Sequence, residues 1–276
     1  MSDRPDVTDL VYAYDGSFPG FLCCVFESFY EKEQPMDISV DPPQSLLYRI
    51  KYVETDQEKA DRVYRSLSRR ICPAAEEAVR LCFLTCLQGK ERAMLDFLRL
   101  GYRVGRRVMD MLQDERVNTV RRAVDHLTRE AHLLKGFVRF SSHNGTLASV
   151  IGPKNFVLPL LADHFSSRLP EERFLIYDEN HHAALVYQPY QARIIRVESF
   201  CLPPADQEEA RCQALWRRFY QTIAVEGREN PRCRIALMPK RYWRYMTEFQ
   251  LPGEPAAALE AGEEAKRLVK PGPPPV

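Results

Sequence analysis

The hydrophobic pattern of the chain changes from that of a strand to that of a helix between residues 10 and 30. The run from Val11 to Tyr14 is β-branched and aromatic, which is typical of a buried strand. Turn-forming residues follow it, namely Asp15, Gly16 and Ser17, and a serine in that place can cap a helix. Beyond them, apolar side chains recur at helical spacing: Phe21, Leu22, Val25, Phe26 and Phe29. The pattern predicts a strand, a tight turn and an amphipathic helix.

The turn between this strand and this helix is a candidate ligand site. A helix N-terminus that follows a strand and a glycine turn presents free N–H groups and the positive end of the helix dipole. Gly16 and Ser17 are therefore candidates for binding a phosphate or a carboxylate. The alternative is that the strand and the helix only build the core, and that the turn binds nothing.

Residues 54–135 have helical periodicity throughout, and we expect them to form a helical block. Thr55-Asp-Gln-Glu58 has the sequence of a capping box, in which the hydroxyl and the carboxylate accept hydrogen bonds from the N–H groups of the first turn. Four arginines lie off the apolar stripe of the helix that follows: Arg62, Arg65, Arg69 and Arg70. The clearest period in the chain comes last, in Val117, Val120, Val124, Leu127, Ala131 and Leu134.

Strand patterns dominate after residue 137. Asn144-Gly145 is a strong signal for a hairpin turn, and Thr146 to Ile151 is the returning strand. Three further strands with turn residues between them are predicted at Phe174–Tyr177, Ala183–Tyr187 and Ala192–Val197. Because short connections allow only antiparallel neighbours, these strands predict a mostly antiparallel sheet.

The C-terminal quarter is expected to be helical before it becomes irregular. Asp206 can begin a long helix whose inward residues would be Cys212, Leu215, Phe219 and Ile223. Residues 251–276 are rich in Pro, Ala and Glu, which predicts a disordered tail. We therefore expect an α+β fold with a single domain over residues 1–250. Its sheet of about five or six strands would pack against the opening and C-terminal helices, with the helical block inserted between the strands.

Composition narrows the class of protein. The net charge is +1, from 39 basic and 38 acidic residues, which excludes a grossly polycationic nucleic-acid binder but leaves room for local basic patches. No apolar run reaches the length of a membrane span, and the first residues are polar rather than a signal peptide. We expect a cytoplasmic protein without membrane association, in which the eight cysteines are buried thiols rather than disulfides.

The segment from Asn230 to Phe249 is both basic and aromatic. Cations neutralise phosphates and flat rings stack on unpaired bases, so the segment is a candidate nucleic-acid site. The alternative is a helix that buries Trp243 and Met246 while its basic side chains extend outward. Alternation along a strand places Arg139 opposite Val138 and Phe140, where it is either exposed or paired. The candidate nucleic-acid-binding residues are Arg139, Arg217, Arg218, Lys240, Arg241, Tyr242, Trp243 and Arg244.

Several motifs resemble those of a known bacterial family. They span about residues 10–249 and are Tyr14-Asp-Gly-Ser17 with Gly20-Phe-Leu22, Lys135-Gly-Phe-Val-Arg-Phe140, Pro159-Leu-Leu-Ala-Asp-His-Phe165, Trp216-Arg-Arg-Phe-Tyr220, Asn230-Pro231 and Met238-Pro-Lys-Arg-Tyr-Trp243. The family that they resemble is described as DNA-metabolism or DNA-repair proteins. Its members are typically paired with a radical-SAM protein and sometimes fused to a uracil-DNA-glycosylase-type domain. The resemblance implies a DNA-linked role with these partners, and it names no catalytic residue.

Other patterns offer weaker chemistry. Cys82-Phe-Leu-Thr-Cys86 has the first spacing of a radical-SAM cluster motif, but Gly89 stands where the third cysteine belongs, so no cluster or other cofactor is expected. Asp163-His164 is a candidate acid–base pair, although His164 also falls on an apolar stripe and suits a partly buried structural role. No metal site is expected.

Three hypotheses of function follow from these observations. The first is an accessory protein of DNA repair or DNA metabolism that binds nucleic acid. The second is an enzyme acting on nucleic acid, with Asp15, Asp163 and His164 as acid–base or metal-binding residues. The third is a subunit that docks a radical-SAM partner without contacting DNA, which an exposed apolar patch would favour.

Overall fold

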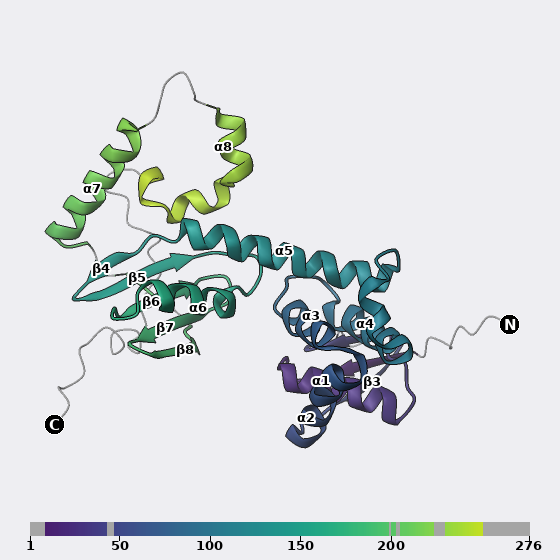
Figure 1. The fold of residues 1–276 in the computed structure, drawn as a ribbon. Helices are drawn as coiled ribbons and strands as arrows, with labels where there is room; N and C mark the ends of the chain where they lie inside the picture. Colours follow the sequence, from purple (N-terminus) through teal and green to yellow (C-terminus); the bar gives the residue numbers. More distant parts are fainter. Residues whose placement is uncertain (1–8, 43–46, 199, 203–204, 224–229, 251–276) are drawn as a thin grey trace, which may run out of the picture. The chain divides into compact units, whose positions relative to one another are not determined.

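The computed structural model of the chain describes residues 9–42, 47–198, 200–202, 205–223 and 230–250. The predicted α+β class is confirmed, because two sheets pack with helices (Figure 1). The chain divides into two compact units, Met1–Leu127 and Thr128–Val276. The expected disordered tail, residues 251–276, lies outside the described residues.

The first unit contains a small parallel sheet and most of the helical block. Its strands are β1 (Leu10–Ala13), β2 (Asp37–Ser39) and β3 (Arg49–Tyr52). Its helices are α1 (Phe18–Tyr30), α2 (Gln57–Ser66), α3 (Pro73–Phe83) and α4 (Lys90–Val104), with a π-helical turn η1 (Leu67–Ile71) and a 3₁₀ helix η2 (Gly105–Asp110). Helix α5 (Glu115–Phe137) runs across the boundary between the two units.

Strand β1 lies between β2 and β3 and pairs with both of them in parallel. Parallel neighbours need a crossover connection, and α1 supplies it between β1 and β2. The opening strand was expected to join the antiparallel sheet, and that expectation is wrong. Short connections imply antiparallel pairing only for the strands after residue 137, whereas the opening strand is followed by a helix.

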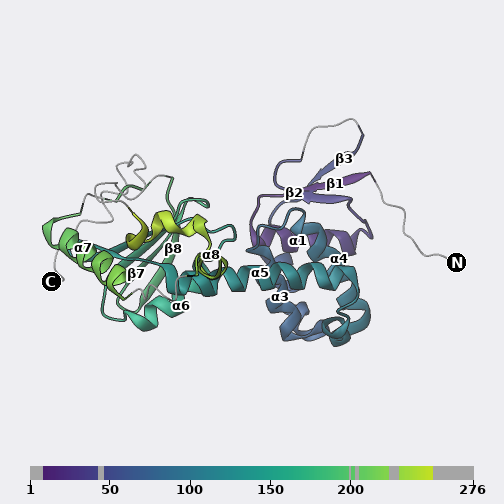
Figure 2. The ribbon, with the colours of Figure 1, turned by 90° about the horizontal axis from the view of Figure 1, so that it is seen from above.

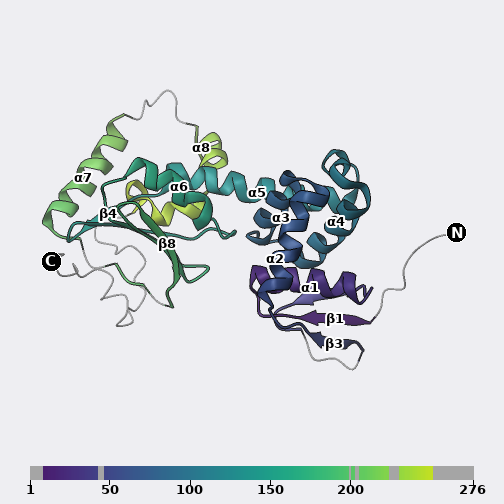
Figure 3. The same cartoon turned by 60° about the horizontal axis from the view of Figure 1, so that its bottom comes forward.

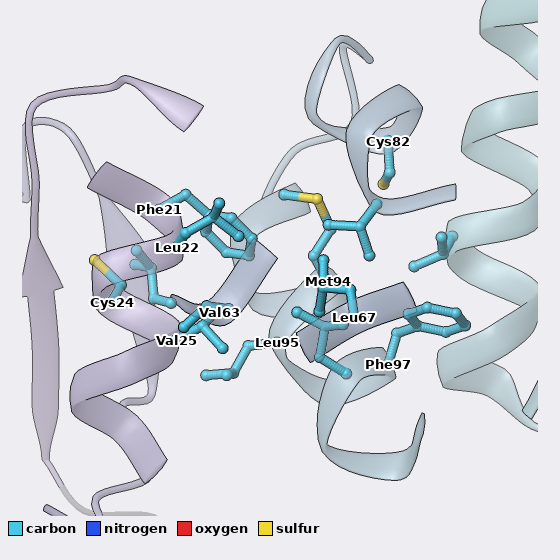
Figure 4. Close-up of a cluster of buried hydrophobic side chains, with 14 of the residues drawn as sticks. Phe21, Leu22, Cys24, Val25, Val63, Leu67, Cys82, Met94, Leu95 and Phe97 are labelled. Carbon is cyan, nitrogen blue, oxygen red and sulfur yellow. The ribbon is translucent and has the colours of Figure 1, made fainter. Parts of the chain in front are cut away.

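Helix α1 packs between this sheet and the helices α3 and α4 (Figures 2 and 3). Its buried positions include Phe21, Leu22 and Val25, which point toward Val63 and Leu95 (Figure 4). The predicted amphipathic helix is therefore confirmed, and burial of this apolar face contributes to the stability of the first unit.

The second unit is built on a five-stranded sheet in the order β4-β5-β6-β7-β8. Its strands are β4 (Ser141–His143), β5 (Thr146–Ile151), β6 (Phe174–Asp178), β7 (Ala183–Gln188) and β8 (Gln191–Arg196). Its helices are α6 (Leu158–Arg168), α7 (Gln207–Thr222) and α8 (Pro231–Leu237), followed by the 3₁₀ helices η4 (Lys240–Tyr245) and η5 (Thr247–Phe249).

The pairing of this sheet is mostly antiparallel, as predicted, and only β5 and β6 run in parallel. The predicted hairpin turn is confirmed: Asn144 and Gly145 have φ angles of 50° and 75°, which is the left-handed region that such a turn requires. Tyr177 of β6 packs on Phe200, and the ring centroids of the two residues are 5.2 Å apart. Strand β8 forms one edge of the sheet, and its Arg193 and Arg196 are exposed.

Helix α7 differs from the expectation. Asp206 caps it, as predicted, by accepting a hydrogen bond from the N–H of Glu209 at 2.8 Å. Its apolar positions were expected to face inward, but Leu215, Phe219 and Ile223 are 66%, 53% and 56% exposed. An amphipathic pattern predicts that a helix has an apolar face, but it does not show that the fold of the same chain covers that face.

None of the helices in the described ranges is both long enough and apolar enough to cross a membrane.

Candidate nucleic-acid interface

The predicted anion-binding turn is occupied by its own side chains. The Asp15 carboxylate accepts hydrogen bonds from the N–H and the hydroxyl of Ser17, at 2.9 and 2.7 Å, and from the Thr55 hydroxyl at 2.8 Å. The Ser17 hydroxyl in turn accepts from the Gly20 N–H at 3.0 Å. Burial opposes ionisation of Asp15, but these hydrogen bonds outweigh it and lower its pKa. A phosphate at Gly16 and Ser17 would compete with this carboxylate.

The capping box at the start of α2 is also different from the prediction. Asp56, not Thr55, is the N-cap, and its carboxylate accepts from the N–H groups of Glu58 and Lys59 at 2.8 and 3.1 Å. The Thr55 hydroxyl is directed to Asp15 instead. The capping-box motif failed to predict the N-cap because the Thr55 hydroxyl bonds to a residue 40 positions earlier in the sequence.

Asp163 and His164 are neighbours on α6, and Asp15 belongs to the other unit. Asp163 is exposed, whereas His164 is half-buried against the ring of Phe165. Partial burial, together with Lys135 and Arg168, lowers the pKa of His164, so its neutral form is favoured. Adjacent helical residues point in different directions, and no hydrogen bond joins this pair within the described residues. Their catalytic role stays a prediction.

Arg139, a candidate contact to nucleic acid, is held by a carboxylate of its own unit. Its guanidinium donates to both oxygens of Glu248, at 3.2 and 2.7 Å, and lies over the ring of Trp216. The Trp216 indole N–H donates to the same carboxylate at 3.0 Å. Burial favours the neutral acid, but these hydrogen bonds outweigh it and lower the pKa of Glu248. Of the two sequence alternatives, exposed or paired, Arg139 is paired.

Arg241 and Tyr242 have a similar structural role around the buried carboxylate of Glu130. The Tyr242 hydroxyl donates to Glu130 at 2.7 Å, and the Arg241 guanidinium lies 3.2 Å from the same oxygen. The backbone N–H of Lys154 also donates to this oxygen, and the N–H of Asn155 donates to the other oxygen of the Glu130 carboxylate. Burial raises the pKa of the Tyr242 hydroxyl to about 12. As Tyr242 is only 1% exposed, it presents no ring to a base.

Three more of the candidate residues make contacts inside the second unit. The half-buried Trp243 stacks on Phe249, with ring centroids 4.5 Å apart, and its N–H donates to the Met238 carbonyl. Arg217 donates to the carbonyl of Thr247 at 3.1 Å. Arg244 contacts Glu179 and the Tyr245 hydroxyl, although its side chain is still 59% exposed.

The remaining candidates lie at the surface. Arg218 and Lys240 are exposed, and neither forms an ion pair within the described part of the chain. On the same helix as Arg218, α7, Trp216 and Phe219 are 39% and 53% exposed, and their ring centroids are 5.8 Å apart. Lys240 lies on η4 and the other three residues on α7, and we call the four exposed residues Trp216, Arg218, Phe219 and Lys240 together the C-terminal surface.

A family comparison covers this surface. Residues 88–248 match the family described as "Domain of unknown function (DUF4130)", and this range is more than half of the chain. The chain belongs to this DUF4130 family. No significant match was found among the curated proteins or among the solved structures.

The DUF4130 range includes both buried carboxylates, Glu130 and Glu248, and Glu248 is its last residue. It also includes all four residues of the C-terminal surface. It leaves out the Asp15 turn and the arginines of α2 and η1. The family match therefore concerns the second unit and the last helices of the first.

Two features of the DUF4130 range were not recognised in the sequence. Phe219 was assigned to the core, because nothing in a helical stripe shows whether it is covered. At the end of β6, the buried Asp178 accepts a hydrogen bond from the His181 ring at 2.7 Å. The three-residue spacing between Asp178 and His181 is the signal in the sequence that could have indicated this contact.

The described ranges contain many His, Cys, Asp and Glu side chains. They contain no group of three or more His, Cys, Asp or Glu side chains placed to hold a metal ion. Cys82, the first cysteine of the incomplete radical-SAM motif, is buried on α3. Burial raises the pKa of its thiol to about 11. Cys86 is exposed, so the two thiols have different surroundings.

Proposed function

We propose that this protein is a cytoplasmic accessory protein of DNA repair or DNA metabolism, and that it binds nucleic acid through its C-terminal surface. The observation that carries the proposal is the pair of exposed rings, Trp216 and Phe219, on the helix that also carries the exposed Arg218. Exposed aromatic rings next to cations are the composition of sites that bind single strands, where rings stack on bases and cations neutralise phosphates.

The internal contacts support the same proposal. Arg139, Trp216 and Glu248 fix the position of α7 against η5, and Tyr220 packs edge-on against Phe249 at 5.5 Å. These contacts hold the ring of Trp216 in one orientation, so that less conformational entropy is lost on binding. The resemblance in the sequence supplies the DNA-linked role and the radical-SAM partner, and the basic and aromatic residues are compatible with both.

The test is binding of the full-length protein to labelled single- and double-stranded DNA across a salt series. Arg218→Ala/Lys240→Ala removes two cations, so we expect the slope of log K against log salt to fall by about 1.4, at about 0.7 per phosphate contact of a single strand. Trp216→Ala and Phe219→Ala should each cost about 1–3 kcal/mol of single-strand affinity.

A matched control is available elsewhere in the same unit. Arg168→Ala/Arg173→Ala removes the same number of exposed positive charges, from the end of α6 and from the residue before β6, and should leave the binding unchanged. Equal losses in both double variants would show that only net charge matters. Absence of binding by the unmodified protein at low salt would reject the proposal.

A second function is favoured by a different observation, the apolar stripe of α7. Leu215, Phe219 and Ile223 are at least half exposed and lie on one helical face, which suits the helix of a protein partner. The partner that the resemblance implies is a radical-SAM protein. Leu215→Ser should then weaken binding to the purified partner and leave DNA binding unchanged, whereas Arg218→Ala should do the reverse.

A further inference from the structure

A second basic surface lies in the first unit, where α2 and η1 form an open groove beside Phe26 of α1. The groove has a volume of about 730 Å³. Its lining residues are Phe26, Glu58, Lys59, Asp61, Arg62, Arg65, Ser66, Arg69 and Arg70. Five of them are cations and two are acids, so the groove has a clear positive excess although the net charge of the chain is only +1.

The cations of the groove differ in how they are engaged. Lys59 pairs with Glu27 at 2.8 Å, and Arg65 donates to the backbone carbonyl of Asp61 at 3.1 Å. Arg62, Arg69 and Arg70 are exposed, and none of the three forms an ion pair within the described residues. Three guanidinium groups are thus available to an anionic ligand, and phosphate is the anion that their planar donors match best.

The π-helical turn accounts for the way these arginines are presented. The N–H of Cys72 bonds to the carbonyl of Leu67 at 3.2 Å, five residues back, which widens the turn. Leu67 and Ile71 are buried in the core, so Arg69 and Arg70 between them face outward. Such turns are rare in helices and are frequently found at functional sites.

The spacing of the arginines suits a chain of phosphates rather than a single one. Arg62 lies on α2 and Arg70 on η1, so their separation along the helix axis is at most roughly 12 Å, at up to about 1.5 Å per residue. Phosphates of one strand in a duplex follow one another at about 3.4 Å along the axis. Several phosphates can therefore lie along the groove, which is open rather than enclosed around one anion.

One aromatic ring, that of Phe26, lines the same groove, and Tyr30 packs against it. The Phe26 ring has Lys59 Nζ at 5.3 Å and Arg62 Cζ at 5.8 Å from its centroid. Tyr30 stacks on Phe26 with centroids 5.7 Å apart and an angle of 14° between the rings. Because Tyr30 is 72% exposed, its outer part is open to a base.

We propose that this groove binds one strand of nucleic acid, with Arg62, Arg69 and Arg70 on phosphates of that strand and the ring of Tyr30, beside the groove, stacked on a base. The choice of ligand rests on the proposed function, but the site does not, since it lies in the other unit and outside the DUF4130 range. The protein would then contact nucleic acid at two separate surfaces.

The test uses full-length variants and labelled oligonucleotides. Arg69→Ala/Arg70→Ala should lower the salt slope by about 1.4, which corresponds to roughly 25-fold weaker binding at about 0.1 M salt. The matched control is Arg121→Ala/Arg122→Ala on α5, which removes two exposed arginines of the same unit outside the groove and should change nothing. All four positions are exposed, so folding is preserved, and far-UV circular dichroism checks this.

Two further measurements separate this proposal from the proposed function. Photocrosslinking of an oligonucleotide that contains bromodeoxyuridine should label the peptide with Tyr30, and it should still do so in the Arg218→Ala/Lys240→Ala variant. Unchanged affinity in Arg69→Ala/Arg70→Ala, with loss in the C-terminal variant, would overturn the groove alone. Binding of adenosine monophosphate as tight as that of an oligonucleotide would overturn the strand as its ligand.

Discussion

The guanidinium of Arg139 donates to both carboxylate oxygens of Glu248, a residue 109 positions later whose side chain is only 1% exposed. Removing one partner of a buried ion pair leaves the other charge without compensation. We therefore expect Arg139→Ala to destabilise the second unit by about 3–5 kcal/mol. Both tryptophans of the chain, Trp216 and Trp243, lie in that unit, so the fluorescence change in a urea titration measures its unfolding.

Arg139→Lys is the control for this prediction. It keeps the positive charge but loses the two parallel hydrogen bonds, so its loss of stability should be smaller. If Arg139→Ala instead weakened DNA binding and left the urea midpoint unchanged, Arg139 would be a contact to nucleic acid after all.

Glu130 should be as important to stability as any apolar residue of its unit. Glu130→Ala leaves the Tyr242 hydroxyl and the N–H groups of Lys154 and Asn155 without their acceptor. Unsatisfied buried donors cost about 1–3 kcal/mol each, and we expect a total loss of about 3 kcal/mol or more. Tyr242→Phe removes only one of these donors and should cost about 1 kcal/mol, measured by the same fluorescence titration.

The same carboxylates predict acid lability. The folded state lowers the pKa of Glu130 and of Glu248 below their ordinary value of 4.5. A lowered pKa means that the unfolded chain binds more protons, so this part of the stability is present above about pH 4.5 and is lost as the pH falls through the folded pKa. Urea midpoints measured from about pH 7 to about pH 3 should therefore fall, and less steeply in Glu130→Gln. A midpoint that rises below pH 4.5 would contradict the assignment.

Two glycine substitutions should have opposite effects. A Cβ on Gly20 would lie 2.2 Å from the Asp15 carboxylate and 2.8 Å from the Thr55 hydroxyl, so Gly20→Ala should break the turn after β1 and destabilise the first unit. A Cβ on Gly136 of α5 meets nothing within 4 Å, so Gly136→Ala should stabilise the helix by up to about 1 kcal/mol. Thermal unfolding followed by circular dichroism measures both variants. A stable Gly20→Ala protein would show that the Asp15 contacts are dispensable.

Thiol modification should separate the cysteines by their surroundings. The exposed group is Cys86, Cys212 and Cys233, and the buried group is Cys23, Cys24, Cys72 and Cys82. Burial raises the pKa of Cys82 to about 11 and also raises the pKa of Cys23 and Cys24, which makes the reactive thiolate scarce at neutral pH. Brief alkylation of the native protein, read by peptide mass spectrometry, should label the exposed group first. Early labelling of Cys82 would indicate that α3 opens readily.

Patterns that depend on neighbouring residues predicted the fold well. The Asn144-Gly145 turn, the strand from Thr146 to Ile151 and the cap at Asp206 are all as expected. The parallel sheet of the first unit was missed, because its pairing depends on a crossover helix and on residues far apart. Val11, for example, lies opposite Ile50.

The candidate site was harder to predict for a similar reason. The basic and aromatic residues were found from composition, but the buried carboxylates that engage Arg139 and Tyr242 lie 109 and 112 positions away in the sequence. A cation in a sequence shows no sign of the carboxylate that neutralises it. Only the packed structure separates residues such as Arg241 from residues such as Arg218.

The charged edge strand of the second unit has a consequence for self-association. Backbone groups along the outer side of β8 could template another strand, and edge-to-edge pairing of this kind leads to aggregation. Two copies that met there would bring Arg193 and Arg196 of each into one ladder, where like charges opposite one another are unfavourable. These two arginines therefore disfavour pairing of β8 with a strand of another copy. Neutralising them should shorten the time that the purified protein stays in solution at high concentration.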